Sequence, residues 1–159
     1  MNRLTRTFAA LMLAGSLAVL AGCSSTSTSE SGEPSMKVWG YVSSADNAQL
    51  ELAGNQQGAD ELVVDRVLSP GDAWIVVHAD DSGKPGMRVG LQHVPKGEST
   101  NVKVALEDLT TPKVIVALHA DRGTADEFDF DMMNKEMSPD RPYFVNRAEL
   151  AKVVEVAAR

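Results

Sequence analysis

Two copies of one short phrase decide the fold: residues 73–80, AWIVVHAD, and residues 113–121, KVIVALHAD. Each copy is an apolar, largely β-branched run that ends in His-Ala-Asp, and a glycine follows shortly, at Gly83 or Gly123. Runs of this length and composition are too short and too β-branched to be helices. They predict two core strands of one small all-β domain, each of which delivers a His and an Asp to the loop that follows it.

Alternating segments extend this pattern on both sides. Residues 62–68 (LVVDRVL), 87–94 (MRVGLQHV) and 100–106 (TNVKVAL) alternate apolar and polar side chains, which is the period of a strand with one buried face. Turn-forming sequences separate them, such as SPGD at residues 69–72. Short strands spaced in this way predict an antiparallel β-sandwich, which we place in residues 36–159.

The ends of this domain are less regular. Residues 36–43 (MKVWGYVS) predict a first strand, with Val38 and Trp39 as apolar anchors and Gly40 at a bulge. Residues 147–159 (RAELAKVVEVAAR) fit an amphipathic helix by propensity, and they also fit a returning strand whose valines complete a sheet. The residues alone leave both alternatives open.

Residues 1–22 are typical of a bacterial lipoprotein signal peptide. Arg3 and Arg6 give a positively charged start, and the apolar run that follows is too short for a stable membrane span. The sequence LAGC at residues 20–23 resembles the lipobox. This resemblance implies cleavage before Cys23, whose thiol receives diacylglycerol and whose new amino group is acylated. Several acyl chains give stable anchoring to a membrane.

The residues that follow the lipobox predict a tether and a destination. Residues 23–35 (CSSTSTSESGEPS) lack apolar side chains that could be buried, so we expect a flexible tether that holds the domain off the bilayer. Ser24 replaces the Asp that usually retains lipoproteins in the inner membrane. In a diderm cell we therefore expect the outer membrane, with the domain facing the periplasm or the cell surface.

The charge and the cysteine count exclude several classes of partner and site. The formal charge is −7, and removal of residues 1–22 takes away Arg3 and Arg6 and no acid, so it becomes −9. An excess of acid argues against binding to nucleic acid or to an anionic membrane surface. Cys23 is the only cysteine, so an internal disulfide and a thiolate metal site such as type-1 copper are excluded.

Several motifs in fixed order resemble a known family. In chain order they are Trp74-Ile-Val-Val-His78, Gly83-Lys-Pro-Gly86, Ala117-Leu-His119-Ala-Asp121-x-Gly123 and Phe128-Asp129-Phe130. Together they resemble a domain-of-unknown-function family of secreted and surface proteins of archaea and bacteria, over about residues 49–156. The resemblance implies an antiparallel immunoglobulin-like β-sandwich of about 7–8 strands. It also favours a C-terminal hairpin, although Arg147 stands where the family has the glycine of an Asn-Gly turn.

The two repeated His-x-Asp phrases are candidate metal ligands. His78 and His119 end matching strands, and Asp80 and Asp121 follow two residues later. An imidazole binds a metal through one nitrogen while a carbonyl or carboxylate holds the other, so a mixed site for a transition metal is one interpretation. In the other interpretation each His bonds the backbone of a neighbouring strand and each Asp caps its loop. His93 belongs to neither phrase, and we expect it to be exposed.

The acidic segment at residues 121–131 is a candidate calcium site. Asp121, Asp126 and Asp129 offer the oxygen ligands that calcium prefers, although their spacing does not match an EF-hand loop. The alternation in residues 128–131 (FDFD) predicts instead a strand with its phenyl rings buried and its acids in water.

We interpret Trp74, Phe128, Phe130 and Gly86 as structural, the three aromatic side chains as part of the core and the glycine as part of a loop. No Gly-x-Ser-x-Gly elbow and no Gly-rich phosphate loop is present, so we do not expect an enzyme. The sequence predicts a lipid-anchored envelope protein with a cofactor-free binding or structural module and an unidentified envelope partner or ligand. The alternative is a module that binds a transition metal or calcium through His78, His119 and the acidic loop.

Overall fold

The computed structural model describes residues 37–38, 41–42, 47–56, 58–135 and 137–157. The expected signal peptide, the lipidated Cys23 and the tether lie outside the described residues, as do Trp39 and Gly40. The single strand expected at residues 36–43 is wrong. The described part forms two short strands, β1 (Lys37–Val38) and β2 (Tyr41–Val42), which pair antiparallel and are therefore not one continuous strand.

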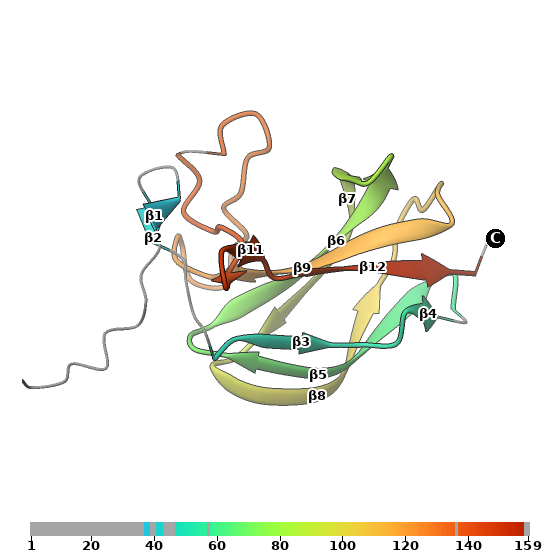
Figure 1. Cartoon of the computed structure of the whole chain (residues 1–159), viewed down its shortest axis with the longest axis horizontal. Helices are drawn as coiled ribbons and strands as arrows, with labels where there is room; N and C mark the ends of the chain where they lie inside the picture. Colours follow the sequence, from blue (N-terminus) through green and yellow to red (C-terminus); the bar gives the residue numbers. More distant parts are fainter. Residues whose placement is uncertain (1–36, 39–40, 43–46, 57, 136, 158–159) are drawn as a thin grey trace, which may run out of the picture. The chain divides into compact units, whose positions relative to one another are not determined.

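Two packed β-sheets form the body of the domain (Figure 1). One has three strands in the order β3-β5-β8: β3 (Gln49–Glu51), β5 (Glu61–Ser69) and β8 (Gly97–Ala105). The other has five in the order β4-β12-β9-β6-β7: β4 (Asn55–Gln56), β12 (Ala151–Val156), β9 (Lys113–Ala120), β6 (Ala73–Asp81) and β7 (Lys84–Val94). All neighbours pair antiparallel except β4 and β12. The order is that of an immunoglobulin-like sandwich, which confirms the predicted fold class.

The two repeated phrases form the centre of the larger sheet. They are the neighbouring strands β6 and β9, paired through Trp74 and His119, Val76 and Ala117, and their neighbours. The inner faces of β6 and β9 pack against β5 and β8 across a common core. Its largest fully buried members include Leu62, Val64, Ile75, Val104 and Leu118. Each such side chain contributes roughly 1.5–3 kcal/mol by leaving water.

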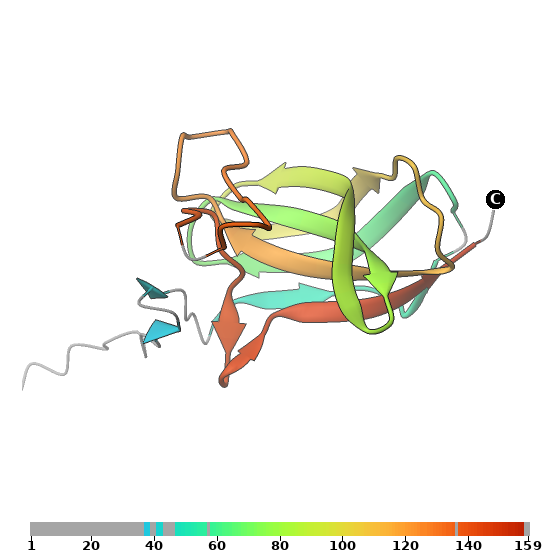
Figure 2. The same ribbon diagram turned by 90° about the horizontal axis from the view of Figure 1, so that it is seen from above.

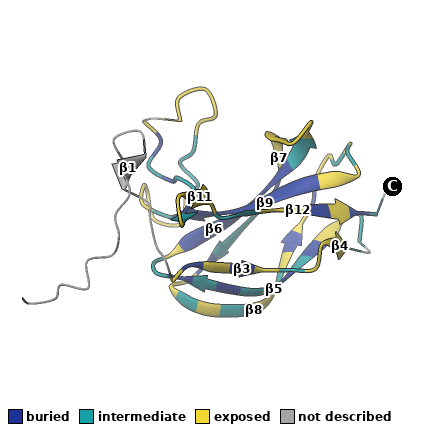
Figure 3. Cartoon of the chain, in the orientation of Figure 1, coloured by how far each residue is buried: buried dark blue, intermediate teal, exposed yellow. Residues whose placement is uncertain are grey.

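The outer face of the larger sheet is also covered. Every residue from Ala73 to His78 and from Val114 to Ala120 is buried, so both faces of β6 and β9 are shielded from water (Figure 3). Continuous burial explains why these two strands have apolar runs rather than an alternating pattern. Trp74 therefore lies outside the core between the sheets, although it is buried as predicted.

The end of the chain forms strands. β10 (Phe144–Val145) and β11 (Ala148–Glu149) make a short hairpin, and β12 then pairs with β9, so the hairpin alternative holds and the helix alternative is wrong (Figure 2). Among the described residues no helix is long and apolar enough to cross a membrane. Asn146 and Arg147 connect β10 and β11 with φ angles of 51° and 69°. Positive values at both central residues are the signature of a type I′ turn, which the arginine made unexpected.

We predict that Arg147→Gly stabilises the domain. A residue with a Cβ in the left-handed region costs roughly 1–2 kcal/mol, and glycine adopts this region freely at a smaller entropic cost. The net gain is expected to be about 1 kcal/mol, which raises the melting temperature by roughly 3–5 °C in a domain of this size. Asn146→Gly is the matched control, and it should gain less because asparagine tolerates this conformation. A lower melting temperature for Arg147→Gly would contradict the turn assignment.

Candidate functional site

The outer face of β6 and β9 is covered by residues 121–142, which connect β9 to β10 and which we call the covering segment. It packs through Phe128 and Phe130, whose ring centroids lie 5.5 and 4.9 Å from that of His119. Both phenyl rings are half-buried and lie outside the core between the sheets. Residues 128–131 form no strand, so the strand predicted from their alternation is wrong. The phenyl rings of the covering segment thus form a second apolar layer over Trp74 and His119.

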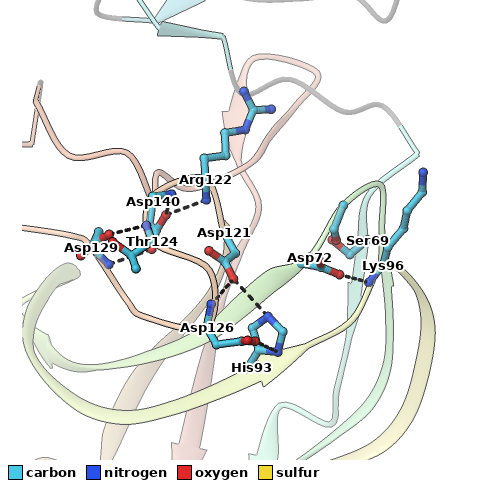
Figure 4. A network of polar contacts seen from close by, with 12 residues as sticks. Ser69, Asp72, His93, Lys96, Asp121, Arg122, Thr124, Asp126, Asp129 and Asp140 are labelled. Carbon is cyan, nitrogen blue, oxygen red and sulfur yellow. Dashed lines mark hydrogen bonds and ion pairs between the residues drawn. The ribbon is translucent and has the colours of Figure 1, made fainter.

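Asp140 holds the covering segment together. Its carboxylate is fully buried and accepts the backbone N–H groups of Arg122 (2.7 Å), Gly123 (3.0 Å) and Asp129 (2.8 Å), as Figure 4 shows in part. Its carbonyl oxygen accepts a hydrogen bond from His119 Nδ1 (3.0 Å). One residue thus ties the start, the middle and the end of the segment to β9. Asp140 was not predicted from the sequence, since an isolated Asp in an irregular stretch carries no pattern.

Gly123 is needed where the covering segment turns back on itself. A Cβ at this position would collide with the carboxylate of Asp129 and with the ring of Pro139. Asp129 Oδ2 in turn accepts the N–H of Thr124 (2.7 Å). Close approach of this kind is possible only for a residue without a side chain.

His78 and His119 both donate a hydrogen bond from Nδ1 to a backbone carbonyl. The acceptors are the oxygens of Gly86 and Asp140, each at 3.0 Å. A carbonyl oxygen only accepts, so Nδ1 carries the proton and Nε2 carries the lone pair. Burial, opposed by the hydrogen bond to Asp140 and assisted by the nearby His78, lowers the pKa of His119 to about 4. Burial also lowers the pKa of His78, so both rings are neutral at pH 7.

The predicted metal ligands do not converge on one point. The rings of His78 and His119 lie 6.4 Å apart, centroid to centroid. Asp80 Oδ1 accepts the N–H of Gly83 (2.6 Å) in the β6–β7 turn, as a loop cap does. Asp129 is likewise occupied within the covering segment. Among the described residues, the one group of three or more His, Cys, Asp or Glu side chains close enough to share an ion is a different set: His93, Asp121 and Asp126.

His93 lies on β7 beside Trp74, its cross-strand neighbour, and the two ring centroids are 4.8 Å apart. Its Nε2 is 3.2 Å from Asp121 Oδ2, and its Nδ1 is 3.8 Å from Asp126 Oδ1 (Figure 4). The side chain is 27% exposed, so the expectation of an exposed His93 is wrong. Trp74 and the two aspartates of the covering segment shield the ring on the outer face of the sheet, where a register shift between β6 and β7 after Val77 places it.

A family model described as a domain of unknown function (DUF7282) matches residues 48–157. The chain belongs to the DUF7282 family. The match extends over nearly the same residues as the motifs that suggested such a family. No curated protein and no solved structure matches the chain.

The described histidines of the DUF7282 domain all face oxygen atoms of the protein. Two donate to carbonyls and are neutral, and the third faces two carboxylates. The hydrogen bonds of His78 and His119 fix these two rings against backbone on the outer face of the larger sheet. Beside it, Phe128, Phe130, Asn134, Met137 and Ser138 help to line a cavity of about 440 Å³ in the covering segment.

Proposed function

We propose that the chain is a lipid-anchored cell-envelope protein whose DUF7282 domain is a non-catalytic binding or structural module. The lipobox at residues 20–23 supports the anchor, and Ser24 supports the outer membrane, facing the periplasm or the surface. The formal charge of −9 after cleavage favours a protein or small-molecule partner over nucleic acid.

The observation that supports the binding role is the exposed part of the covering segment around Met133 and Met137. Met133 is 95% exposed and Met137 is 76% exposed, beside the cavity that Met137 itself helps to line. Exposed methionines are common at adaptable binding surfaces because the thioether chain is flexible and polarisable. The cavity lies in the size range of ligand sites, with aromatic walls and a few polar groups. The buried Asp140 holds the base of this surface in place.

We predict that Cys23→Ser abolishes acylation of the protein. Serine cannot form the thioether to diacylglycerol, so the precursor keeps its signal peptide or is secreted without lipid. Fractionation of cells and intact-mass measurement should find no acylated protein for Cys23→Ser, whereas Ser24→Ala should remain acylated and in the membrane fraction. Acylation and membrane association that persist in Cys23→Ser would contradict the proposed anchor.

Site-specific photocrosslinking in intact cells tests the binding role. A photoreactive phenylalanine analogue replaces Met133 in one variant and Thr100, an exposed residue of β8 on the other sheet, in a second. We expect a discrete adduct at residue 133 that is absent at residue 100. Equal labelling at both sites, or none at either, would count against this surface as the binding face.

A further inference from the structure

We propose that His93, Asp121 and Asp126 bind one divalent transition-metal ion, of which Zn²⁺ is the representative. The site lies where the covering segment leaves β9 and passes β7. It goes beyond the proposed binding role, which assigns no metal. It also differs from the site expected from the sequence, because His93 supplies the nitrogen ligand in place of His78 and His119.

The distances suit a shared ion. Ligand bonds to Zn²⁺ of about 2.0–2.2 Å place two ligand atoms of a tetrahedral site about 3.4 Å apart. The separation of 3.2 Å between His93 Nε2 and Asp121 Oδ2 is close to this value. One ligand atom from each of the three residues lies within 4.8 Å of the others. The side chain of Asp126 is 83% exposed, so it can turn toward the ion without disturbing the packing.

The polar contacts of the His93 imidazole also favour a bound cation. A neutral imidazole has one N–H and one lone pair, yet both nitrogens of His93 face carboxylates. A neutral ring in this position would turn its lone pair toward a carboxylate, and a proton or a metal ion at that nitrogen removes the repulsion. Nε2 is buried and has no hydrogen-bond partner. An ion between Nε2 and the carboxylates replaces this repulsion with two attractive contacts.

The ligand set selects the class of ion. Imidazole nitrogen suits zinc and its neighbours, whereas calcium takes six to eight oxygen ligands. Three protein ligands leave a fourth position for water. Asp121 is 6% exposed and its Oδ2 also accepts the N–H of Asp126 (3.2 Å), which fixes one carboxylate before the ion arrives. Because His93 belongs to β7, the ion would fasten the covering segment to the sheet edge.

Competition with a fluorescent zinc chelator tests the site on the full-length protein, purified in detergent without a His-tag and stripped of metal. We expect one equivalent of Zn²⁺ to bind, and calcium at the same concentration not to displace it. His93→Ala and Asp126→Asn should each weaken zinc binding at least tenfold, since loss of even an outer partner costs about 10–100-fold. Glu127→Gln, an exposed neighbouring acid, is the matched control and should bind as the wild type does.

Two results would overturn the site. One is the absence of stoichiometric zinc binding. The other is unchanged affinity in both His93→Ala and Asp126→Asn, particularly if His78→Gln abolishes binding, which would move the ion to the two buried histidines. Asp126→Asn alters an exposed side chain, so a folded variant is expected, and circular dichroism of each variant verifies it. Hydrogen exchange at residues 121–126 should slow on adding zinc to the wild type and not to His93→Ala.

Discussion

Asp140→Ala is expected to lower the free energy of unfolding by about 3–5 kcal/mol. Three backbone N–H groups, those of Arg122, Gly123 and Asp129, lose their acceptor at once. A buried donor left without a partner costs roughly 1–3 kcal/mol, and bonds to a charged acceptor are at the strong end of the range. Two of the three residues are exposed and regain some water, which keeps the sum below the maximum. Urea denaturation followed by tryptophan fluorescence measures the change.

Two control variants isolate the role of this carboxylate. Asp140→Asn keeps the shape and one oxygen, which still accepts from Arg122 and Gly123, but it turns an NH₂ group toward the N–H of Asp129. Its expected loss is about half that of alanine. Glu127→Ala removes an exposed acid of the same segment and should change stability by less than about 0.5 kcal/mol. If Asp140→Ala proves as stable as Glu127→Ala, another contact must hold the segment.

The strands were predictable because their patterns are set by local burial. β6 and β9 contain β-branched runs that suit strands with two covered faces, and β5 and β8 contain the alternation of strands with one covered face. Turn residues marked their ends. The sequence did not reveal which strands are neighbours, yet the fold class needed only their number, length and spacing.

The position of His93 was not predictable, because the register shift between Val77 and His78 reverses the alternation of β7. Pattern alone puts Val89 and Leu91 on one face. In the structure Val89 belongs to the core, a side chain at Gly90 would touch Val104 and Leu106, and Leu91 pairs with Val76 on the outer side. Two consecutive residues therefore face inward, and every residue beyond them changes sides. Only the partner strand defines such a shift.

The covering segment was unpredictable for a related reason. The conformation of this segment depends on hydrogen bonds between the buried carboxylate of Asp140 and backbone N–H groups eleven to eighteen residues away. Asp121, Asp126 and Asp129 suggested ion ligands by composition, and the structure uses each of them to bond backbone within the segment or to face His93. The composition gives the number of carboxylates, whereas only the folded geometry decides which oxygen meets which donor.

Acidification from pH 7 to pH 5 is expected to destabilise the domain through His119. The pKa of this imidazole falls from 6.5 to about 4 on folding, because the ring is 2% exposed beneath Phe128 and Phe130. Above pH 6.5 the ring is neutral in both states and contributes no pH dependence. Between pH 6.5 and 4 only the unfolded chain binds the proton, so the free energy of unfolding decreases as the pH is lowered. From pH 7 to 5 the expected loss is about 2 kcal/mol, and the lowered pKa of His78 adds to it.

His119→Asn separates this effect from other titrations. Asparagine can donate from a similar position to the carbonyl of Asp140, but it does not titrate and it leaves space beneath the phenyl rings. The variant should be less stable at pH 7, yet it should lose about 2 kcal/mol less than the wild type on going to pH 5. Denaturation at pH 7, 6 and 5 gives both slopes, and NMR of the ring protons should find His119 unprotonated down to about pH 4. Parallel slopes for the two proteins, or a ring that titrates near pH 6.5, would mean that the covering segment admits water to β9 and that burial of His119 does not control its charge.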